Sequence, residues 1–509
     1  MKSLEELKNR KPEDIDIIFI NPGNLHAVYQ NLASDFSAIE TPSLIALFAS
    51  FIRSRKYSVE IIDAPAFGLS PEQVAEVISQ HFRPVLIVMV VYGYQPSAST
   101  QNMPAAGETC KCIKKMLPYS KVLMTGTHPA ALPGQTLVDE DIDFVCSGEG
   151  PETIVQVMES LKTDNASYSY IPDLYYFEDG KIRSTPPSTL ISDLDAAMPE
   201  PALDLLPMEK YRAHNWHCFE DINNRQPYAS IHTSLGCPYH CSFCCINAPF
   251  GKSSYRMWSP DNIIKQIDVL VNDYNIKNIK IVDEMFVLNK NHVLGICNRI
   301  IERGYDLNIW AYARIDTIKD EYLSSLREAG FRWLALGIES ASKHVRDGVE
   351  KGRFGTDDVL EIIKKIKDAE INIIGNYIFG LHDDDMETMQ ETLDMAIEAN
   401  CEFANFYSAM AYPGSPLYLH ASKQGWKLPD SWIGYSQHSY ETLPLPTEHI
   451  SAAEVLKFRD EAFHKYFSNK RYLDMVQDKF GNDAYNNIQK MLEIKLDRAI
   501  YEQEEEIRI

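Results

Sequence analysis

Three cysteines in one short segment carry the clearest chemical signal of this sequence. Cys237, Cys241 and Cys244 lie in the run Ser-Leu-Gly-Cys-Pro-Tyr-His-Cys-Ser-Phe-Cys, a C-x3-C-x2-C spacing. Three thiolates so spaced can hold a four-iron cluster while one iron keeps no protein ligand. Chemistry can take place at that open iron. We therefore predict a redox-active cluster on this segment.

The other cysteines carry no comparable pattern. Cys245 adjoins the third cysteine but falls outside the spacing, so we expect a packed or shielding thiol. Cys110 and Cys112 lie on a predicted helix with no further ligands beside them, and we interpret them as incidental. Ten cysteines in 509 residues, without the dense pattern of a small secreted scaffold, fit a reducing compartment.

Composition and charge narrow the class of partner. Hydrophobic residues make up 45% and aromatic residues 11% of the chain, which is ample for packed cores in about three domains. A formal net charge of -23, with no cluster of Lys and Arg, disfavours nucleic acid as the main partner, so we expect a small-molecule substrate. No leader pattern opens the chain, and its longest apolar run, 85–92, is only as long as a strand. We expect no membrane span and a cytoplasmic location.

The pattern of apolar runs predicts two sheets of parallel strands with covering helices. The first sheet is expected from strands at 16–20, 58–63, 85–92, 121–125 and 143–146. Between the first two strands, Thr41 and Pro42 supply a cap and a first-turn proline for a helix. No G-x-G-x-x-G follows the first strand and no G-x4-G-K-[ST] occurs, so NAD and ATP are poor candidates for a ligand here.

The second series of strands predicts a partial barrel. Its strands are expected at 228–233, 278–283, 307–312, 333–338, 371–379 and 403–409. Ser259 and Pro260 mark the start of its first helix. Beyond Pro416 the pattern becomes helical. We divide the chain into a first domain, a connection rich in Pro, Asp, Tyr and Ser, a barrel and a helical end, at 12–160, 161–225, 226–425 and 426–509.

Residues 226–420, approximately, resemble the radical S-adenosylmethionine (SAM) enzymes. The resemblance rests on the cysteine segment, on Phe243 before its last cysteine and on the six strand–helix units. In that family the open iron chelates the methionine moiety of SAM, and an electron cleaves SAM to a 5′-deoxyadenosyl radical. The resemblance implies SAM contacts from Glu284, Arg314, Glu339 and Ser340, which follow three strands. The chain lacks the usual Gly-Gly-Glu before position 284, and a plain strand-end acid there and a structural ion pair at Arg314 stay open as alternatives.

Four loops of the first domain resemble the cobalamin-binding domain that precedes the barrel in one large subfamily, the class B radical SAM methyltransferases. They lie at 40–44, 94–100, 126–129 and 147–150. The resemblance implies cobalamin contacts from Tyr94, Gln95, Ser97, Ser99, Thr100, Gly126, Thr127, His128, Gly148 and Glu149. Ordinary turn bonds are the alternative for the hydroxyl groups. Because Asp-x-His-x-x-Gly is absent, His128 is expected in the pocket wall and not as the lower ligand of cobalt, which favours an accessible Co(I) state.

The expected architecture is therefore α/β, with an N-terminal Rossmann-like cobalamin-binding domain, a partial (β/α)6 radical SAM barrel and a C-terminal helical region. The connecting run 211–219 is dense in functional side chains, and it either closes over the substrate or corrin or simply docks the two domains.

The resemblance implies a methyltransferase that acts on an unactivated carbon of a small metabolite. One molecule of SAM would methylate Co(I), and another would give the radical that prepares the substrate for methyl transfer from methylcobalamin. A flavodoxin or ferredoxin would supply electrons. The alternatives are a cyclisation, oxidation or rearrangement with the same cofactors, a methylthio transfer, which the lack of a second cysteine triad disfavours, and a noncatalytic cobalamin sensor or carrier.

Overall fold

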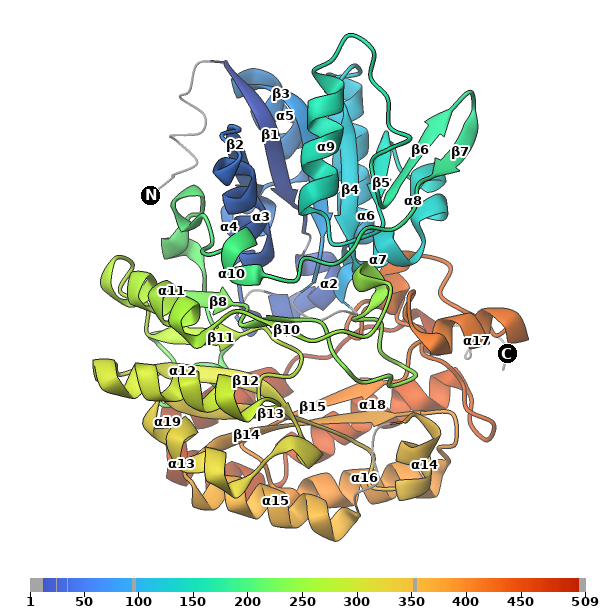
Figure 1. The fold of residues 1–509 in the computed structure, drawn as a ribbon. Coiled ribbons are helices and arrows are strands. Elements are labelled where there is room, and N and C mark those ends of the chain that lie inside the picture. Colours follow the sequence, from blue (N-terminus) through green and yellow to red (C-terminus); the bar gives the residue numbers. More distant parts are fainter. Residues whose placement is uncertain (1–11, 24, 34, 94–97, 351–354, 503–509) are drawn as a thin grey trace.

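The structure is a computed structural model that describes residues 12–23, 25–33, 35–93, 98–350 and 355–502. Tyr94, Gln95 and Ser97 lie outside the described residues. Two sheets dominate the fold, one in the blue and cyan first part of the chain and one in the green to orange part below it (Figure 1).

The first sheet has seven strands in the order β2-β1-β3-β4-β5-β6-β7, and its first five strands, which were all predicted, are parallel. Helices α3 and α9 cover one face and α5 and α6 cover the other (Figure 1). The strands are β1 (Glu13–Asn21), β2 (Val59–Asp63), β3 (Phe82–Val91), β4 (Val122–Gly126), β5 (Phe144–Cys146), β6 (Leu174–Glu178) and β7 (Lys181–Ser184). The helices are α2 (Leu25–Tyr29), α3 (Ser43–Ser54), α4 (Ala64–Phe67), α5 (Pro71–His81), α6 (Ala98–Met116), α7 (Thr127–Ala131), α8 (Pro133–Asp139) and α9 (Pro151–Leu161).

Two details of this part differ from the prediction. The hairpin of β6 and β7 extends the sheet antiparallel beyond β5, within a segment expected to be a connection. It was missed because β7 is exposed along its whole length and carries no apolar alternation. Thr41 does not cap α3: Pro42 occupies that position, no side chain caps the helix, and the buried Thr41 hydroxyl has no hydrogen-bond partner among the described residues.

The second sheet is a parallel six-stranded partial barrel, as predicted, and its strands lie in the order β15-β14-β13-β12-β11-β8. Its strands are β8 (Tyr228–Ile231), β11 (Asn278–Ile281), β12 (Asn308–Arg314), β13 (Phe331–Glu339), β14 (Asn372–Phe379) and β15 (Phe403–Ser408). A short antiparallel pair joins β9 (Ser234–Leu235) to β10 (Arg256–Met257). The outer helices are α11 (Pro260–Asn272), α12 (Lys290–Arg303), α13 (Asp320–Glu328), α14 (Lys343–Gly348), α15 (Thr356–Asp368) and α16 (Met386–Ala399), and α10 (Leu194–Ala197) lies on the connection.

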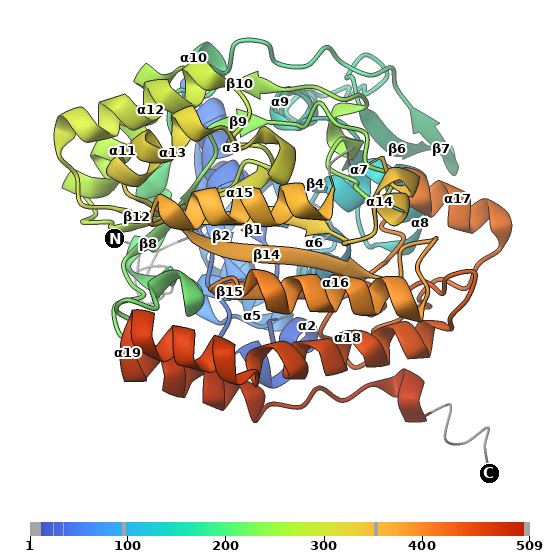
Figure 2. The same cartoon turned by 90° about the horizontal axis from the view of Figure 1, so that it is seen from below.

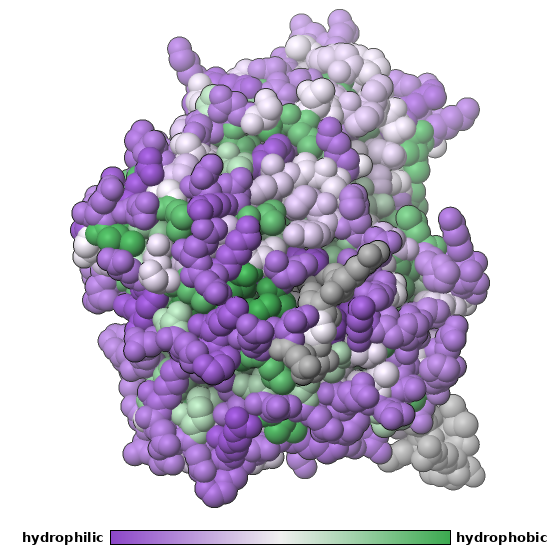
Figure 3. Space-filling model, turned by 60° about the horizontal axis from the view of Figure 1, so that its bottom comes forward, coloured by the Kyte–Doolittle hydropathy of each residue, from purple (hydrophilic) through white to green (hydrophobic). Residues whose placement is uncertain are grey.

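The C-terminal helices cover the open side of the barrel. Helix α18 packs on β15 and against α19 (Figure 2). These helices are α17 (Pro416–Gln424), α18 (Ala452–Phe467) and α19 (Lys470–Leu492). No helix among the described residues is long and apolar enough to cross a membrane. The face drawn in Figure 3 is mostly hydrophilic, in keeping with the charge of the chain.

Candidate functional site

The carboxyl ends of the two sheets face each other across a cavity of about 510 Å³. Cys237, Cys241 and Cys244 all line it, so the structure brings the three predicted ligands into one wall. Phe243 and Cys245 line it too. The first domain contributes its strand and helix ends to the opposite wall, at Asn21, Pro22, Gly23, Pro65, Tyr92, Ala98, Gln101 and Asn102. A volume of this size is typical of pockets for small ligands and cofactors.

Local hydrogen bonds hold the cysteine loop to the barrel. The Asp283 carboxylate, at the end of β11, accepts hydrogen bonds from Thr233 N at 2.6 Å, Thr233 Oγ1 at 2.5 Å and Ser234 Oγ at 2.6 Å. Gly236 has φ +84°, and a Cβ there would lie 2.5 Å from Ser254 O, so only glycine fits. The loop therefore leaves the barrel in one fixed direction.

Burial governs the protonation of the thiols on the cysteine loop. Burial raises the pKa of Cys237 to about 11 and that of Cys245 to about 12. At neutral pH both thiols are therefore protonated without a metal, and Cys237 would lose its proton on binding to iron. The Cys245 side chain lies among residues of the cavity wall, 3.5 Å from where a Cβ at Gly414 would be, which fits the predicted packed thiol.

Arg314, at the end of β12, contacts the cysteine loop directly. Its Nη1 donates to Cys241 Sγ at 3.5 Å, and its guanidinium stacks 3.9 Å from the centre of the Tyr239 ring. It also pairs with Asp316 through two hydrogen bonds of 2.8 and 2.9 Å. Burial lowers the pKa of Arg314, but Asp316 more than offsets this, so the side chain stays charged beside the sulfur. The structure thus contains the ion pair that the sequence left open, and the same residue lines the cavity.

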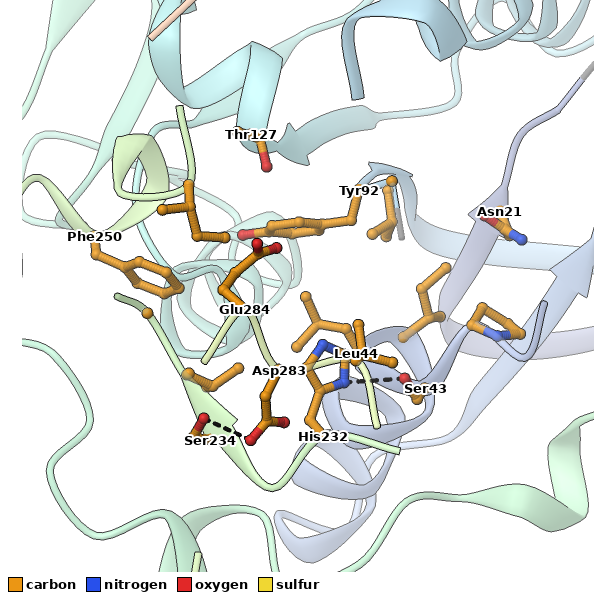
Figure 4. Close-up of a pocket in the computed structure, with 18 residues that line it drawn as sticks. Asn21, Ser43, Leu44, Tyr92, Thr127, His232, Ser234, Phe250, Asp283 and Glu284 are labelled. Carbon is orange, nitrogen blue, oxygen red and sulfur yellow. Dashed lines mark hydrogen bonds between the residues drawn. The ribbon is translucent and has the colours of Figure 1, made fainter. Parts of the chain in front are cut away.

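Glu284 and Glu339 both line the large cavity, at the ends of β11 and β13. Glu284 also borders a second cavity of about 80 Å³ between the domains, where it lies between Phe250 and Tyr92 with Thr127 nearby (Figure 4). Glu339 has φ +67°, which is an uncommon backbone geometry for a residue other than glycine. Ser340 is fully buried outside the cavity wall, and its hydroxyl lies 3.2 Å from that of Thr392.

The described candidates of the first domain form bonds mainly with one another. Ser99 Oγ donates to Val91 O and accepts from His128 N at 2.9 Å, and Thr100 Oγ1 lies 3.1 Å from His128 Nδ1. Burial lowers the pKa of His128 to about 3, and its ring packs on Trp432 with centroids 4.5 Å apart. These contacts give His128 a structural role, and it lines neither of the two cavities, in contrast to its expected place in the pocket wall.

Two glycines of the first domain, Gly126 and Gly148, lie too close to neighbouring atoms to carry a side chain. A Cβ at Gly126 would lie 2.1 Å from Val91 O, and one at Gly148 would lie 2.3 Å from an Asp173 carboxylate oxygen. Glu149 pairs with Arg256 Nη1 at 2.6 Å and so ties the first domain to β10. Among the cobalamin candidates that the structure describes, Thr127 alone lines either of the two cavities.

The sequence did not single out Lys280, whose side chain projects into the barrel. Its Nζ donates to Glu40 Oε1 at 3.0 Å and lies 4.8 Å from the Trp310 ring centre. Glu40 also accepts from Tyr228 and Ser230, at 2.6 and 2.5 Å. Both side chains line the cavity, as do His214, Asn215 and Trp216 of the connecting run. Side chains alternate between the two faces of a strand, so Asn278 and Lys280 lie on the same face of 278–281. This alternation is the sequence signal from which the position of Lys280 could have been predicted.

Comparisons with known proteins agree with this arrangement. Residues 231–396 match the family model of the radical SAM superfamily, and residues 32–158 match that of the B12 binding domain. An uncharacterized methyltransferase of Pyrococcus horikoshii is 28% identical over 87% of this chain and 91% of its own. An anaerobic magnesium-protoporphyrin IX monomethyl ester cyclase of Cereibacter sphaeroides is 24% identical over 89% of this chain and 70% of its own.

Solved structures show the same fold. The cobalamin-dependent SAM radical enzyme OxsB, with aqua-cobalamin and SAM bound, has a TM-score of 0.67 at 15% identity, over 93% of this chain and 71% of its own. The radical SAM methyltransferase TsrM of Kitasatospora setae, with cobalamin and a [4Fe-4S] cluster bound, has a TM-score of 0.62 at 16% identity, over 81% of this chain and 78% of its own. Three cysteines in one cavity wall, opposite a matched B12-binding domain, fit a cluster, SAM and cobalamin. The chain therefore combines a B12-binding domain with a radical SAM domain, the combination found in cobalamin-dependent radical SAM enzymes.

Proposed function

We propose that this enzyme transfers a methyl group to an unactivated carbon of a small organic molecule. The observation that supports this most directly is the shared cavity, because the cysteine loop and the ligand-facing edge of the first domain line one space. When bound, the cluster with SAM supplies a hydrogen-abstracting radical, and cobalamin carries the methyl group. The methyltransferase of Pyrococcus horikoshii, similar over nearly its whole length, favours methyl transfer.

The residues of the chain take defined roles in this proposal. Cys237, Cys241 and Cys244 bind the cluster, and Arg314 donates to one of these sulfurs, which stabilises the thiolate. Glu284 and Glu339 bind the positively charged part of SAM. Residues 12–160 bind cobalamin, and 226–425 form the radical-generating barrel. Phe243, which lines the cavity next to Cys244, contacts SAM.

The test uses anaerobically reconstituted enzyme, methyl-labelled SAM and a pool of small metabolites. We expect 5′-deoxyadenosine to form under reduction and label to appear in a substrate-derived product. Cys241→Ala is the matched control and should abolish both. Absence of SAM cleavage from fully loaded enzyme would contradict the radical chemistry. A reduced flavodoxin or ferredoxin should replace the chemical reductant if one of these proteins is the electron donor.

A second candidate function is a cyclisation with the same cofactors. It is favoured by the magnesium-protoporphyrin cyclases of Cereibacter sphaeroides and Rubrivivax gelatinosus, which are 24% and 26% identical over about nine tenths of this chain. The same incubation separates the two functions. Substrate conversion with no methyl label in the product would favour the cyclase-type reaction and reject methyl transfer.

A further inference from the structure

Two arginines beside the large cavity share one carboxylate. Arg459 Nη1 donates to Asp460 Oδ1 at 2.8 Å, while Arg498 donates to both Asp460 oxygens at 2.9 and 3.1 Å. The side chains of Arg459 and Arg498 are 6% and 0% exposed. Within the part of the chain that the structure describes, neither guanidinium contacts a second carboxylate. This group of three side chains therefore carries one surplus positive charge in a buried place.

Arg459 is the member of the group that lines the cavity. Its Nε donates to Phe406 O at 2.8 Å, and its Nη2 lies 3.3 Å from His438 Nε2. A guanidinium has five N–H groups, and Arg459 has three acceptors among the described residues. Burial and the two arginines hold the pKa of His438 well below its usual value, so the imidazole is neutral and adds no counter-charge. A buried charge is costly unless a partner compensates it.

Two other cations of the cavity wall each pair with a carboxylate of their own, whereas Arg459 shares Asp460 with Arg498. Lys280 pairs with Glu40, and Arg314 pairs with Asp316. The wall around Arg459 is amphipathic. The His438 ring lies 5.6 Å from that of Tyr29, and the neighbouring lining is rich in apolar and aromatic side chains, including Phe403, Phe406, Phe463 and Met491. Such a wall suits an apolar body with one charged end.

We propose that Arg459 binds an anionic group of the substrate, a carboxylate or a phosphate, while the aromatic wall binds its apolar body. The substrate class is then an organic anion with an apolar framework. This inference rests on the proposed function in taking the cavity as the substrate site. The bound anion balances the surplus charge of Arg459 and Arg498 and accepts its remaining N–H groups.

The test compares two fluorescent probes that differ in one group. 8-Anilinonaphthalene-1-sulfonate carries an anion, and N-phenyl-1-naphthylamine has the same aromatic body without it. Both are titrated into anaerobic enzyme loaded with cluster and cobalamin. We expect Arg459→Met to weaken binding of the sulfonate about tenfold or more, and binding of the neutral probe less than about twofold. Arg459→Lys, which keeps the charge, should lose less than Arg459→Met.

Two controls make the result decisive. Arg299→Met removes an arginine from a surface ion pair with Asp261 and should change neither titration. Arg459→Met leaves Arg498 and Asp460 as a balanced pair, so the thermal midpoint of this variant should stay near that of the parent. If the Arg459→Met variant does not fold, the comparison of Arg459→Lys with the parent tests the proposal. Three results for Arg459→Met would overturn the proposal. These are an equal loss of affinity for both probes, an unchanged affinity for the sulfonate, and a loss of bound cobalamin without a loss of sulfonate binding.

Displacement of the sulfonate identifies the anion. 2-Naphthoate and 2-naphthyl phosphate should compete, and the stronger competitor shows which group the site prefers, whereas the neutral 2-naphthol should compete poorly. Displacement by 2-naphthol as strong as that by the two anions would also overturn the proposal. Because no turnover is needed, failure of methyl transfer leaves this result unaffected.

Discussion

Cys241 and Cys245 are buried thiols on one loop, and their spacing predicts different roles. Cys241→Ala should lower bound iron from about four atoms per chain to near zero, because two thiolates no longer hold the cluster. Cys245→Ala should keep the iron, since this thiol is expected only to pack. Iron and sulfide quantitation after anaerobic reconstitution checks both variants. Loss of iron in Cys245→Ala would show that the fourth cysteine takes part in binding.

Asp63, at the end of β2, links stability to pH. Burial raises its pKa from 3.8 to about 6, although Asn21 and Tyr211 donate to the carboxylate at 2.9 and 2.8 Å. Since the pKa is higher in the folded state, this group stabilises the fold below about pH 4, and that contribution is lost as pH rises through about 6. Asp63→Asn cannot ionise.

We therefore expect the Asp63→Asn variant to gain stability over the parent as pH rises from about 4 to 7. The gain should reach about 3 kcal/mol, which corresponds to roughly two pKa units. Urea unfolding of both proteins across this range measures it, with the exposed Asp164→Asn as a control. A difference that stays constant with pH would contradict the assignment.

At the scale of elements, helix α11 begins at Pro260, as the sequence predicted. Ser259 Oγ accepts from Asn262 N at 3.2 Å, and Pro260 occupies the first turn. Ser259→Ala should lower the free energy of unfolding by about 1 kcal/mol, because one N–H of the first turn loses its acceptor. Ser324→Ala, on the exposed side of α13, is the control and should change it by less than about 0.5 kcal/mol. Chemical denaturation compares the two, and equal effects would rule out the cap.

At the scale of the whole molecule, the pair of Glu40 and Lys280 joins the two domains. Burial raises the pKa of Glu40, but Lys280, His214 and two hydroxyl donors lower it below its usual value, so the pair is ionic. Lys280→Met should destabilise the protein by about 3–5 kcal/mol, because a buried carboxylate loses its counter-charge. Adding Glu40→Gln should restore part of that loss. A double-mutant cycle in thermal unfolding measures the coupling, and strictly additive effects would show that the pair does not join the domains energetically.

Local patterns in the sequence were enough to predict the elements. All eleven predicted strands form. Runs of β-branched residues bounded by turn residues favour a buried strand, and this preference depends on neighbours in the sequence. The start of α11 and the cysteine spacing are equally local, since neighbours within a few residues decide them. The hairpin of β6 and β7 was missed because its second strand is exposed and is stabilised by pairing with the first.

The sequence by itself determined the two sheets, the cysteine loop and the kind of cofactor chemistry. Only the tertiary structure decided which strand-end residues meet. It placed Glu284, Glu339 and Arg314 in one cavity but bonded Ser99, Thr100 and His128 to one another. It also brought Arg459 beside Arg498, and Lys280 beside Glu40, 240 residues apart in the chain. Such pairs form because two separate sheets bury their ligand-facing ends against each other, and no short-range pattern encodes which distant charges then share that space.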